Sequence, residues 1–193
     1  MAARRTRRPT LRYARGLRCF ACARAVTETA ASPTPRRIVR FYWEDFPVGQ
    51  TRQFGNYLVT RQAVLDFARQ FDPQPFHLDD AAAAQSLFGR LAASGWHTCA
   101  MAMRMICDAY LLDSASLGSP GIERLTWPKP VFPGDILHMR STVVAARPLA
   151  SRPAVGVVRT RSEMLNQRDE IVLSMEGAGF FGRRHAAAPA PAA

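Results

Sequence analysis

The sequence predicts an α+β domain in which an antiparallel sheet wraps around one long central helix. Residues 94–113 form a long segment with apolar side chains on nearly every face, and a helix that is apolar all round is expected to be buried all round. Beyond Pro120 the pattern changes to β-rich segments separated by Pro, Gly, Asn and Asp turns, which favours consecutive antiparallel strands. The sheet formed by these strands would curve around the helix.

A strand and an amphipathic helix are expected first along the domain. Residues 50–59 (TRQFGNYLVT) are rich in β-forming side chains that partly alternate with polar ones, which predicts a strand. In residues 61–71 the apolar positions recur at helical spacing, with Thr60 as the N-cap. The helix must end by Asp72, because the proline that follows disfavours the α-conformation of the residue before it.

Two helices of different length are expected next, followed by the strands. The short one covers residues 79–88 and is closed by Gly89. The central one covers residues 94–113, and its only strong charges before its end are Arg104 and Asp108, which stand four residues apart and can form an ion pair. The strands beyond Pro120 are expected at residues 121–127, 134–146, 154–166 and 170–181.

The formal net charge of +11 is concentrated at the N-terminus. Residues 1–40 hold eleven arginines and one acidic residue, whereas residues 41–193 hold 15 basic and 14 acidic groups. Nucleic-acid binding needs a basic stripe on the folded part, so we expect no nucleic-acid partner. Residues 1–40 are interpreted as a disordered extension, although a transit peptide and a misassigned start codon also fit their composition. Residues 185–193 are expected to be a disordered Ala/Pro tail, which leaves a domain over residues 41–184.

The four cysteines and the hydropathy favour a protein of the cytoplasm. Cys19 and Cys22 form a C-x-x-C pair, but no second pair and no partner histidines accompany it, so neither a metal nor a redox cofactor is expected. Cys99 and Cys107 fall in the apolar helix and are interpreted as small core residues. Without a disulfide framework, a reducing compartment is the default. The charges inside residues 94–113 favour a core helix over a membrane span, so no membrane association is expected.

The stretch FDPQPFHLD, residues 71–79, contains the strongest candidates for proton transfer. On a helix, Asp72 and His77 would lie about 140° apart and could not act on one substrate. Prolines exclude a helix there, and in a bent loop the carboxylate and the imidazole can converge on one water, as general acid–base catalysis requires. The D-x4-H spacing also occurs by chance, in which case Asp72 only ends a helix and His77 is a satisfied loop histidine.

The stretch GRLAASGWHT, residues 89–98, adds a candidate anion site. Ser94 and Gly95 stand at the N-terminus of the apolar helix, where backbone N–H groups lack intrahelical acceptors and the helix dipole favours negative charge. Glycine lets a ligand carbonyl approach its amide, as an oxyanion hole requires. Ser94 is better placed as an N-cap than as a nucleophile, and His97 is expected to pack or to bond a neighbour rather than to act as a second proton donor.

Four motifs occur in order along the chain: YWEDFPVGQ at 42–50, D-x-x-P-x-H at 72–77, ASGWHT at 93–98 and RLTWPKPVFPGDIL at 124–137. Together they resemble the MaoC-like dehydratases, relatives of the (R)-specific enoyl-CoA hydratases. The resemblance extends from about residue 41 to residue 184. It implies a hot dog fold, with a long central helix wrapped by an antiparallel sheet, and a homodimer or higher homo-oligomer with active sites near the interface.

The resemblance also implies a reaction, the reversible syn addition of water to a trans-2-enoyl-CoA thioester, without a cofactor. Asp72 and His77 would hold and activate the water and return a proton to the α-carbon. The amide of Gly95 would stabilise the enolate-like thioester oxygen. The residues expected to contact the acyl-CoA substrate are Gln74, Ser94, Trp96 and Met103. A thioesterase and a non-catalytic acyl-CoA-binding subunit of the same fold remain alternatives.

Three positions depart from the pattern of the family. The well-studied hydratases tend to have Asn where this chain has Gln74 and His where it has Ser94, and some use a serine at the position of Met103. Gln74 supplies the same hydrogen-bonding groups at a longer reach. We therefore expect Met103 to change the geometry around the substrate more than the reaction itself.

Overall fold

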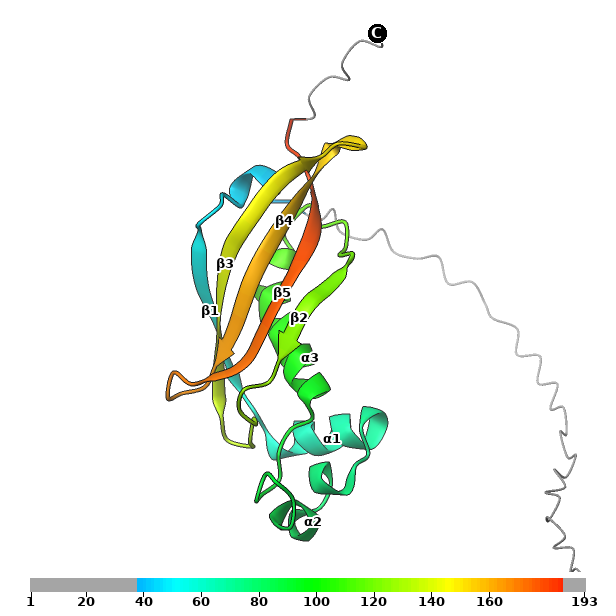
Figure 1. Cartoon of the computed structure of the whole chain (residues 1–193), viewed down its shortest axis with the longest axis vertical. Helices are drawn as coiled ribbons and strands as arrows, with labels where there is room; N and C mark the ends of the chain where they lie inside the picture. The colour runs from blue at the N-terminus through cyan, green and yellow to red at the C-terminus, as the bar shows by residue number, and fades with distance from the viewer. Residues whose placement is uncertain (1–37, 186–193) are drawn as a thin grey trace, which may run out of the picture. The chain divides into compact units, whose positions relative to one another are not determined.

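The computed structural model of the chain describes residues 38–185 (Figure 1). The extension expected over residues 1–40 lies outside the described residues except for its last three positions, and so does the Cys19–Cys22 pair. The Ala/Pro tail lies outside them except for His185. Between residues 38 and 185, no helix is long and apolar enough to cross a membrane.

A five-stranded antiparallel sheet forms one layer of the domain. In spatial order its strands are β1 (Thr51–Leu58), β3 (Ile136–Leu149), β4 (Arg152–Leu165), β5 (Ile171–Gly182) and β2 (Gly121–Thr126). The strand expected at residues 50–59 and the four expected beyond Pro120 are all confirmed, with bounds shifted by at most three residues.

Alternation along β3 gives the sheet one apolar face and one charged face. Leu137 and Met139 point into the core and are fully buried. Arg140 points outward and forms an ion pair with Glu163 of β4 at 2.8 Å. Because side chains alternate with a period of two, this pattern fixes the pairing register of the strand.

Helix α3 (Gly95–Ile106) lies against the apolar face of the sheet and continues as one π-helical turn, Cys107–Leu111 (Figure 1). Met101 and Met105 are the large side chains that it contributes to the main core, where they meet the buried residues of β3. A helix lying along a wrapped antiparallel sheet is the hot dog arrangement, so the predicted fold class is confirmed.

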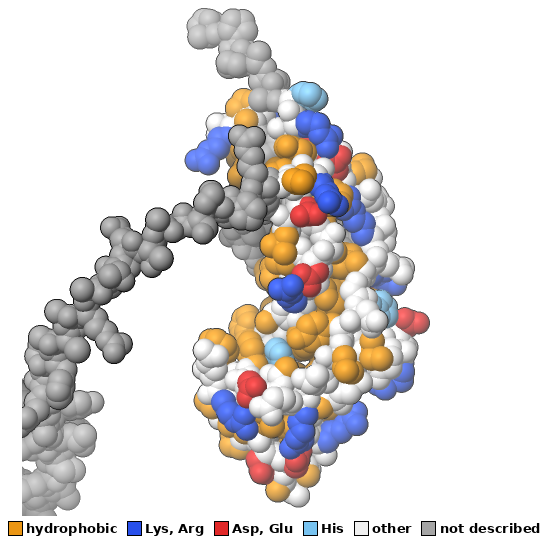
Figure 2. All heavy atoms as spheres, turned by 180° about the vertical axis from the view of Figure 1, so that it is seen from behind, with side chains coloured by type: hydrophobic (Ala, Val, Ile, Leu, Met, Phe, Trp, Pro, Cys, Tyr) orange, Lys and Arg blue, Asp and Glu red, His pale blue; other side chains and the backbone are white. Residues whose placement is uncertain are grey.

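The expectation that this helix is buried on every side is wrong. Trp96 is 62% exposed and Met103 is 49% exposed. Trp96, Ala100 and Met103 stand at positions i, i+4 and i+7, so they lie on one stripe of α3. One sheet covers one side of a helix, so this stripe stays open in a single copy of the domain. Figure 2, the view from behind, shows apolar side chains gathered along the middle of that face. The expected ion pair between Arg104 and Asp108 forms beside this stripe at 2.7 Å.

Two short helices lie beyond the end of the sheet, near the N-terminus of α3 (Figure 1). The first, α1 (Arg61–Phe71), begins as predicted, with the Thr60 hydroxyl accepting a hydrogen bond from the Ala63 N–H at 3.2 Å. The second, α2 (Asp80–Ala84), is capped by the side chain of Asp79.

Helix α2 is shorter than the helix predicted over residues 79–88. The hydroxyl of Ser86 donates to the Ala83 carbonyl at 2.7 Å and accepts from the Phe88 N–H at 3.1 Å. These local bonds replace backbone bonds that a continuing helix would need, so the helix ends before Ser86.

Candidate active site

The connection between α1 and α2 turns Asp72 and His77 toward each other. Helix α1 ends at Phe71, and the next regular element is a single 3-10 turn, Pro75–His77. His77 Nε2 then lies 3.6 Å from Asp72 Oδ2. The prolines interrupt the helix that would have placed the two side chains on different faces.

The imidazole of His77 is held by one backbone group. Its Nδ1 lies 2.8 Å from the carbonyl oxygen of Ala92, and the side chain is almost entirely buried. A carbonyl can only accept a hydrogen bond, so Nδ1 carries the proton and the lone pair of the neutral ring is on Nε2. Nε2 and the Asp72 carboxylate are then two neighbouring hydrogen-bond acceptors. A molecule with two protons, such as water, can donate one hydrogen bond to each of them.

The Asp72 carboxylate is stabilised in its ionised form. The hydroxyl of Ser94 donates to Oδ2 at 2.6 Å, and the side-chain amide of Gln74 donates to Oδ1 at 2.8 Å. The hydrogen bond from Ser94 does most to lower the pKa of Asp72, burial opposes it, and Gln74 and His77 add to the lowering. The carboxylate therefore stays ionised at neutral pH and can accept a proton.

Ser94 links this carboxylate to the start of α3. It is the N-cap of the helix, where its oxygen accepts a hydrogen bond from the Trp96 N–H at 3.2 Å, and it is 1% exposed. Among residues 38–185, no acceptor is found for the N–H of Gly95, the first residue of the helix. This amide remains available to a ligand that enters beside Asp72.

A cavity of about 370 Å³ connects these groups. Five of the residues predicted from the sequence line it: Asp72, Gln74, His77, Gly95 and Trp96. The rest of its wall consists of Phe76, Phe88, Ala93, Thr98, Trp127, Lys129, Pro130 and Val131. Ser94 lies beneath this cavity, where it contacts the carboxylate rather than the open space.

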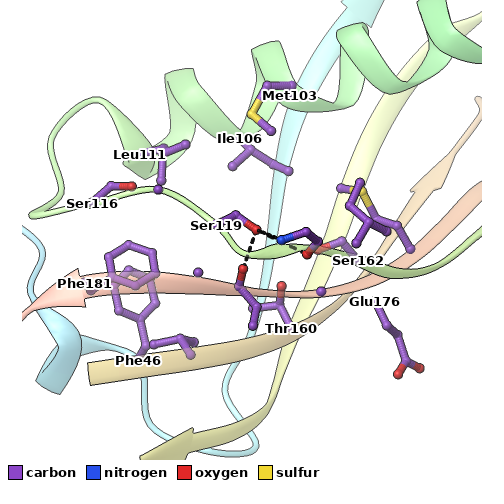
Figure 3. A pocket seen from close by; sticks show the side chains of 18 of the residues that line it. Phe46, Met103, Ile106, Leu111, Ser116, Ser119, Thr160, Ser162, Glu176 and Phe181 are labelled. Atoms are coloured by element: carbon purple, nitrogen blue, oxygen red, sulfur yellow. Dashed lines mark hydrogen bonds between the residues drawn. The ribbon is translucent and has the colours of Figure 1, made fainter. Parts of the chain in front are cut away.

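Met103 lies in a different cavity. A space of about 310 Å³ lies between α3 and the inner face of β2, β4 and β5, and Figure 3 shows Met103 and Ile106 extending into it from the helix. It shares no lining residue with the cavity at Asp72. Eight residues separate Met103 from Gly95, which is about 12 Å along the helix axis at 1.5 Å per residue.

Trp127 and Lys129 are among the eight residues of the cavity wall that were not predicted to belong to the site. Both lie in the proline-rich segment after β2, inside the motif WPKPVFPGD. Lys129 is the only lysine in a chain that otherwise uses arginine for all its basic side chains. This unusual choice is a signal in the sequence that could have drawn attention to it.

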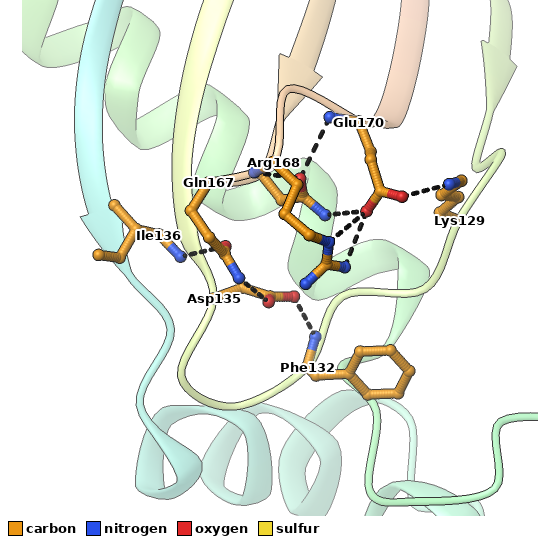
Figure 4. A network of polar contacts seen from close by, with 8 residues as sticks. Lys129, Phe132, Asp135, Ile136, Gln167, Arg168 and Glu170 are labelled. Atoms are coloured by element: carbon orange, nitrogen blue, oxygen red, sulfur yellow. Dashed lines mark hydrogen bonds and ion pairs between the residues drawn. The ribbon is translucent and has the colours of Figure 1, made fainter.

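The segment with these two residues is tied to the β4–β5 turn (Figure 4). Lys129 Nζ lies 2.5 Å from Glu170, whose pKa falls to about 2 because the side chains of Asn166, Lys129 and Arg168 all bond its carboxylate. A few residues later, Asp135 accepts a hydrogen bond from Gln167 of the same turn at 3.1 Å. The wall of the cavity is therefore held at two points.

His97 packs instead of facing the cavity, as the sequence predicts. It is 6% exposed, and its ring stacks on Phe67 at 4.7 Å between centroids. Its Nδ1 has no hydrogen-bond partner in the described part of the chain, and burial lowers its pKa. No group of three or more His, Cys, Asp or Glu side chains within residues 38–185 is arranged to hold a metal ion.

Comparison with known proteins identifies relatives over most of the domain. A family model described as MaoC like domain matches residues 45–164. The crystal structure of a MaoC-like dehydratase from Rhodospirillum rubrum is 43% identical, with a TM-score of 0.71, and covers 76% of this chain and 99% of that one. A conserved hypothetical protein of Mycobacterium tuberculosis with a double hot dog fold shares the architecture (18% identity, TM-score 0.61, 77% of this chain and 46% of that one).

One curated enzyme matches over a shorter stretch. Mesaconyl-CoA hydratase of Cereibacter sphaeroides is 48% identical over 66 residues. The matched stretch is 34% of this chain and 19% of that enzyme.

Proposed function

From the premise that this chain belongs to the MaoC-like family, we propose that it is a hydro-lyase that adds water reversibly to a trans-2-enoyl-CoA thioester. One observation carries the proposal. The Asp72 carboxylate and the His77 Nε2 lie 3.6 Å apart on the wall of one cavity, which Gly95 also lines. The partial match to mesaconyl-CoA hydratase supports a CoA thioester as the substrate class.

The three groups suit the chemistry of hydration. A water that donates to both Asp72 and His77 has its oxygen lone pair directed toward the β-carbon of the enoyl group. As this C–O bond forms, the Asp72–His77 pair accepts one proton of the water, and the electron pair of the C=C bond moves toward the thioester oxygen. A hydrogen bond from the Gly95 N–H stabilises that negative charge. The proton then passes to the α-carbon, which gives the 3-hydroxyacyl thioester.

The neighbouring residues position these groups. Ser94 and Gln74 hold the Asp72 carboxylate from two sides and keep it ionised. Trp96 forms part of the substrate wall. An acyl chain that continues along α3 from the amide of Gly95 reaches the cavity at Met103 after about 12 Å.

We propose a homodimer as the working unit. The exposed stripe of Trp96, Ala100 and Met103 on α3 is apolar, and Ile122 on the edge strand β2 is 55% exposed. A second copy of the domain would cover these side chains and pair the unpaired strand edge. Light scattering on the eluting peak of a sizing column should give twice the mass of one chain, and a monomer at micromolar concentration would contradict this.

The test of the reaction is the replacement of each proton-transfer group by an isosteric amide. Asp72→Asn and His77→Gln should each lower the turnover of crotonyl-CoA by about 10² to 10⁴. The assay follows the loss of ultraviolet absorbance of the conjugated double bond. A thiol reagent run in parallel detects free CoA and thereby distinguishes a thioesterase.

Two control substitutions lie outside the cavity. Asp66→Asn removes an exposed carboxylate of α1 that pairs with Arg69, and His138→Gln removes a half-buried histidine on the outer face of β3. Both variants should keep parental turnover. Hydration at the parental rate by Asp72→Asn and by His77→Gln would refute the assigned reaction.

A further inference from the structure

An indole lies against the helix terminus that holds the candidate oxyanion amide. A Cβ atom built on Gly95 would come within 2.9 Å of Cε2 of Trp127 and within 3.2 Å of both Cδ2 and Cζ2. Three ring atoms at nearly equal distance mean that the face of the indole, not its edge, covers the Gly95 Cα. The space that a side chain at position 95 would fill is therefore occupied by Trp127.

The indole is held by its neighbours. Burial raises the pKa of the Cys99 thiol, one turn further along α3, and the side chain of Trp127 beside it opposes this rise. The ring of Trp96 meets the indole edge to face at 5.8 Å between centroids. Pro128 follows it directly, and the segment it belongs to is tied to the β4–β5 turn through Lys129 and Glu170. Trp127 is thus fixed over the first turn of α3 although it is 42% exposed.

We propose that Trp127 is a positioning residue for the thioester carbonyl, because its indole forms the wall beside the Gly95 amide and keeps water from it. The inference rests on the proposed function, in which that amide binds the thioester oxygen. A hydrogen bond to a developing negative charge is stronger where water is excluded. The position of Trp127 also gives a second reason why residue 95 is a glycine. A side chain there would collide with the indole as well as with the ligand.

A double-mutant cycle of Trp127→Ala and Gly95→Ala tests this proposal. Trp127→Ala should lower kcat for crotonyl-CoA by about 10- to 100-fold, with a smaller change in KM, because losing an oxyanion donor outright costs about 10² to 10³. Trp127→Phe keeps a ring over Gly95 and should restore kcat to within about fivefold of the parent. A purely structural role would not divide the effect between kcat and KM in this way.

The second arm of the cycle is Gly95→Ala. In the parent background the new methyl group collides with the indole, so the melting temperature should fall by roughly 3 to 10 °C and kcat should fall with it. In the Trp127→Ala background the same methyl group no longer meets the indole, so the melting temperature should not fall further and kcat should fall by less than it does in the parent background. Circular dichroism at the assay temperature establishes that each variant is folded.

The outcomes separate this inference from the proposed function. A parent protein that does not hydrate crotonyl-CoA contradicts the function itself. In an active parent, Gly95→Ala losses of equal size with and without Trp127 would show that the ligand, not the indole, needs the space, and would overturn the proposal. Parental kcat in Trp127→Ala would overturn it as well.

Discussion

Replacing Ser94 by alanine should move the pH dependence of the reaction without removing any catalytic group. The Ser94 hydroxyl donates to Asp72 Oδ2 at 2.6 Å and is the largest cause of the lowered pKa of Asp72. A hydrogen bond to a charged group stabilises the charged form by about 1.5 to 3 kcal/mol. Without this donor, the pKa of Asp72 should rise in Ser94→Ala.

The sign of the effect follows from the ionised form being the active one. In the parent, the lowered pKa keeps the Asp72 carboxylate charged at pH values below 3.8, the ordinary pKa of the group. The stability that the charged carboxylate contributes is lost only as the pH falls through the lower pKa of the folded state. In Ser94→Ala the pKa of Asp72 in the folded protein moves upward, whereas its value in the unfolded chain does not change. The acid limb of kcat/KM for crotonyl-CoA should shift to higher pH, while the rate at neutral pH changes less.

Thr60→Ala is the matched control for this measurement. Thr60 caps α1 as Ser94 caps α3, with a 3.2 Å bond to a backbone N–H in each case, but it contacts no group of the cavity. Each variant loses about 0.5 to 2 kcal/mol of stability with its cap. Only Ser94→Ala should move the acid limb. An unchanged acid limb in folded Ser94→Ala protein, or an equal shift in both variants, would show that the Ser94 hydroxyl does not set the pKa of Asp72.

Three further outcomes are expected. Burial lowers the pKa of His97, so below about pH 6.5 the unfolded chain takes up a proton that the folded chain resists. The melting temperature should therefore fall as the pH decreases through that value. This fall should be smaller in His97→Phe, and His138→Gln should show the same fall as the parent. Met103→Trp fills part of the cavity along α3 and should lower the ratio of kcat/KM for a medium-chain enoyl-CoA to that for crotonyl-CoA, and an unchanged ratio would place the acyl chain elsewhere. Arg104→Ala breaks an exposed ion pair and should leave the melting temperature within about 2 °C of the parent; a larger drop would mean that the pair is covered in an oligomer.

The arrangement of the fold follows from local patterns that are strong in this sequence. The alternation along β3 and the Thr60 cap each identify an element without reference to the rest of the chain. Apolar content alone could not distinguish core from surface on α3, because Trp96 and Met103 are as apolar as the buried Met101 and Met105. The side that the sheet covers is decided by the curvature of the sheet, which no local pattern records.

The site was predictable where proline chemistry constrains it. The prolines at 73 and 75 exclude a helix, so the convergence of Asp72 and His77 could be expected from the sequence. The role of Ser94 as a donor to Asp72 depends on a contact between two residues that lie 22 positions apart in the chain. The position of Trp127 over Gly95 depends on a contact between the segment after β2 and α3. Such contacts between distant segments are fixed by packing and have no signature in residue spacing.

The most direct test of the central claim is a crystal structure of the Asp72→Asn protein with 3-hydroxybutyryl-CoA bound. We expect the hydroxyl of the ligand to lie within hydrogen-bond distance of both the side chain at position 72 and Nε2 of His77, and the thioester oxygen to accept a hydrogen bond from the amide of Gly95. A thioester oxygen directed away from that amide, or a hydroxyl that contacts neither side chain, would contradict it.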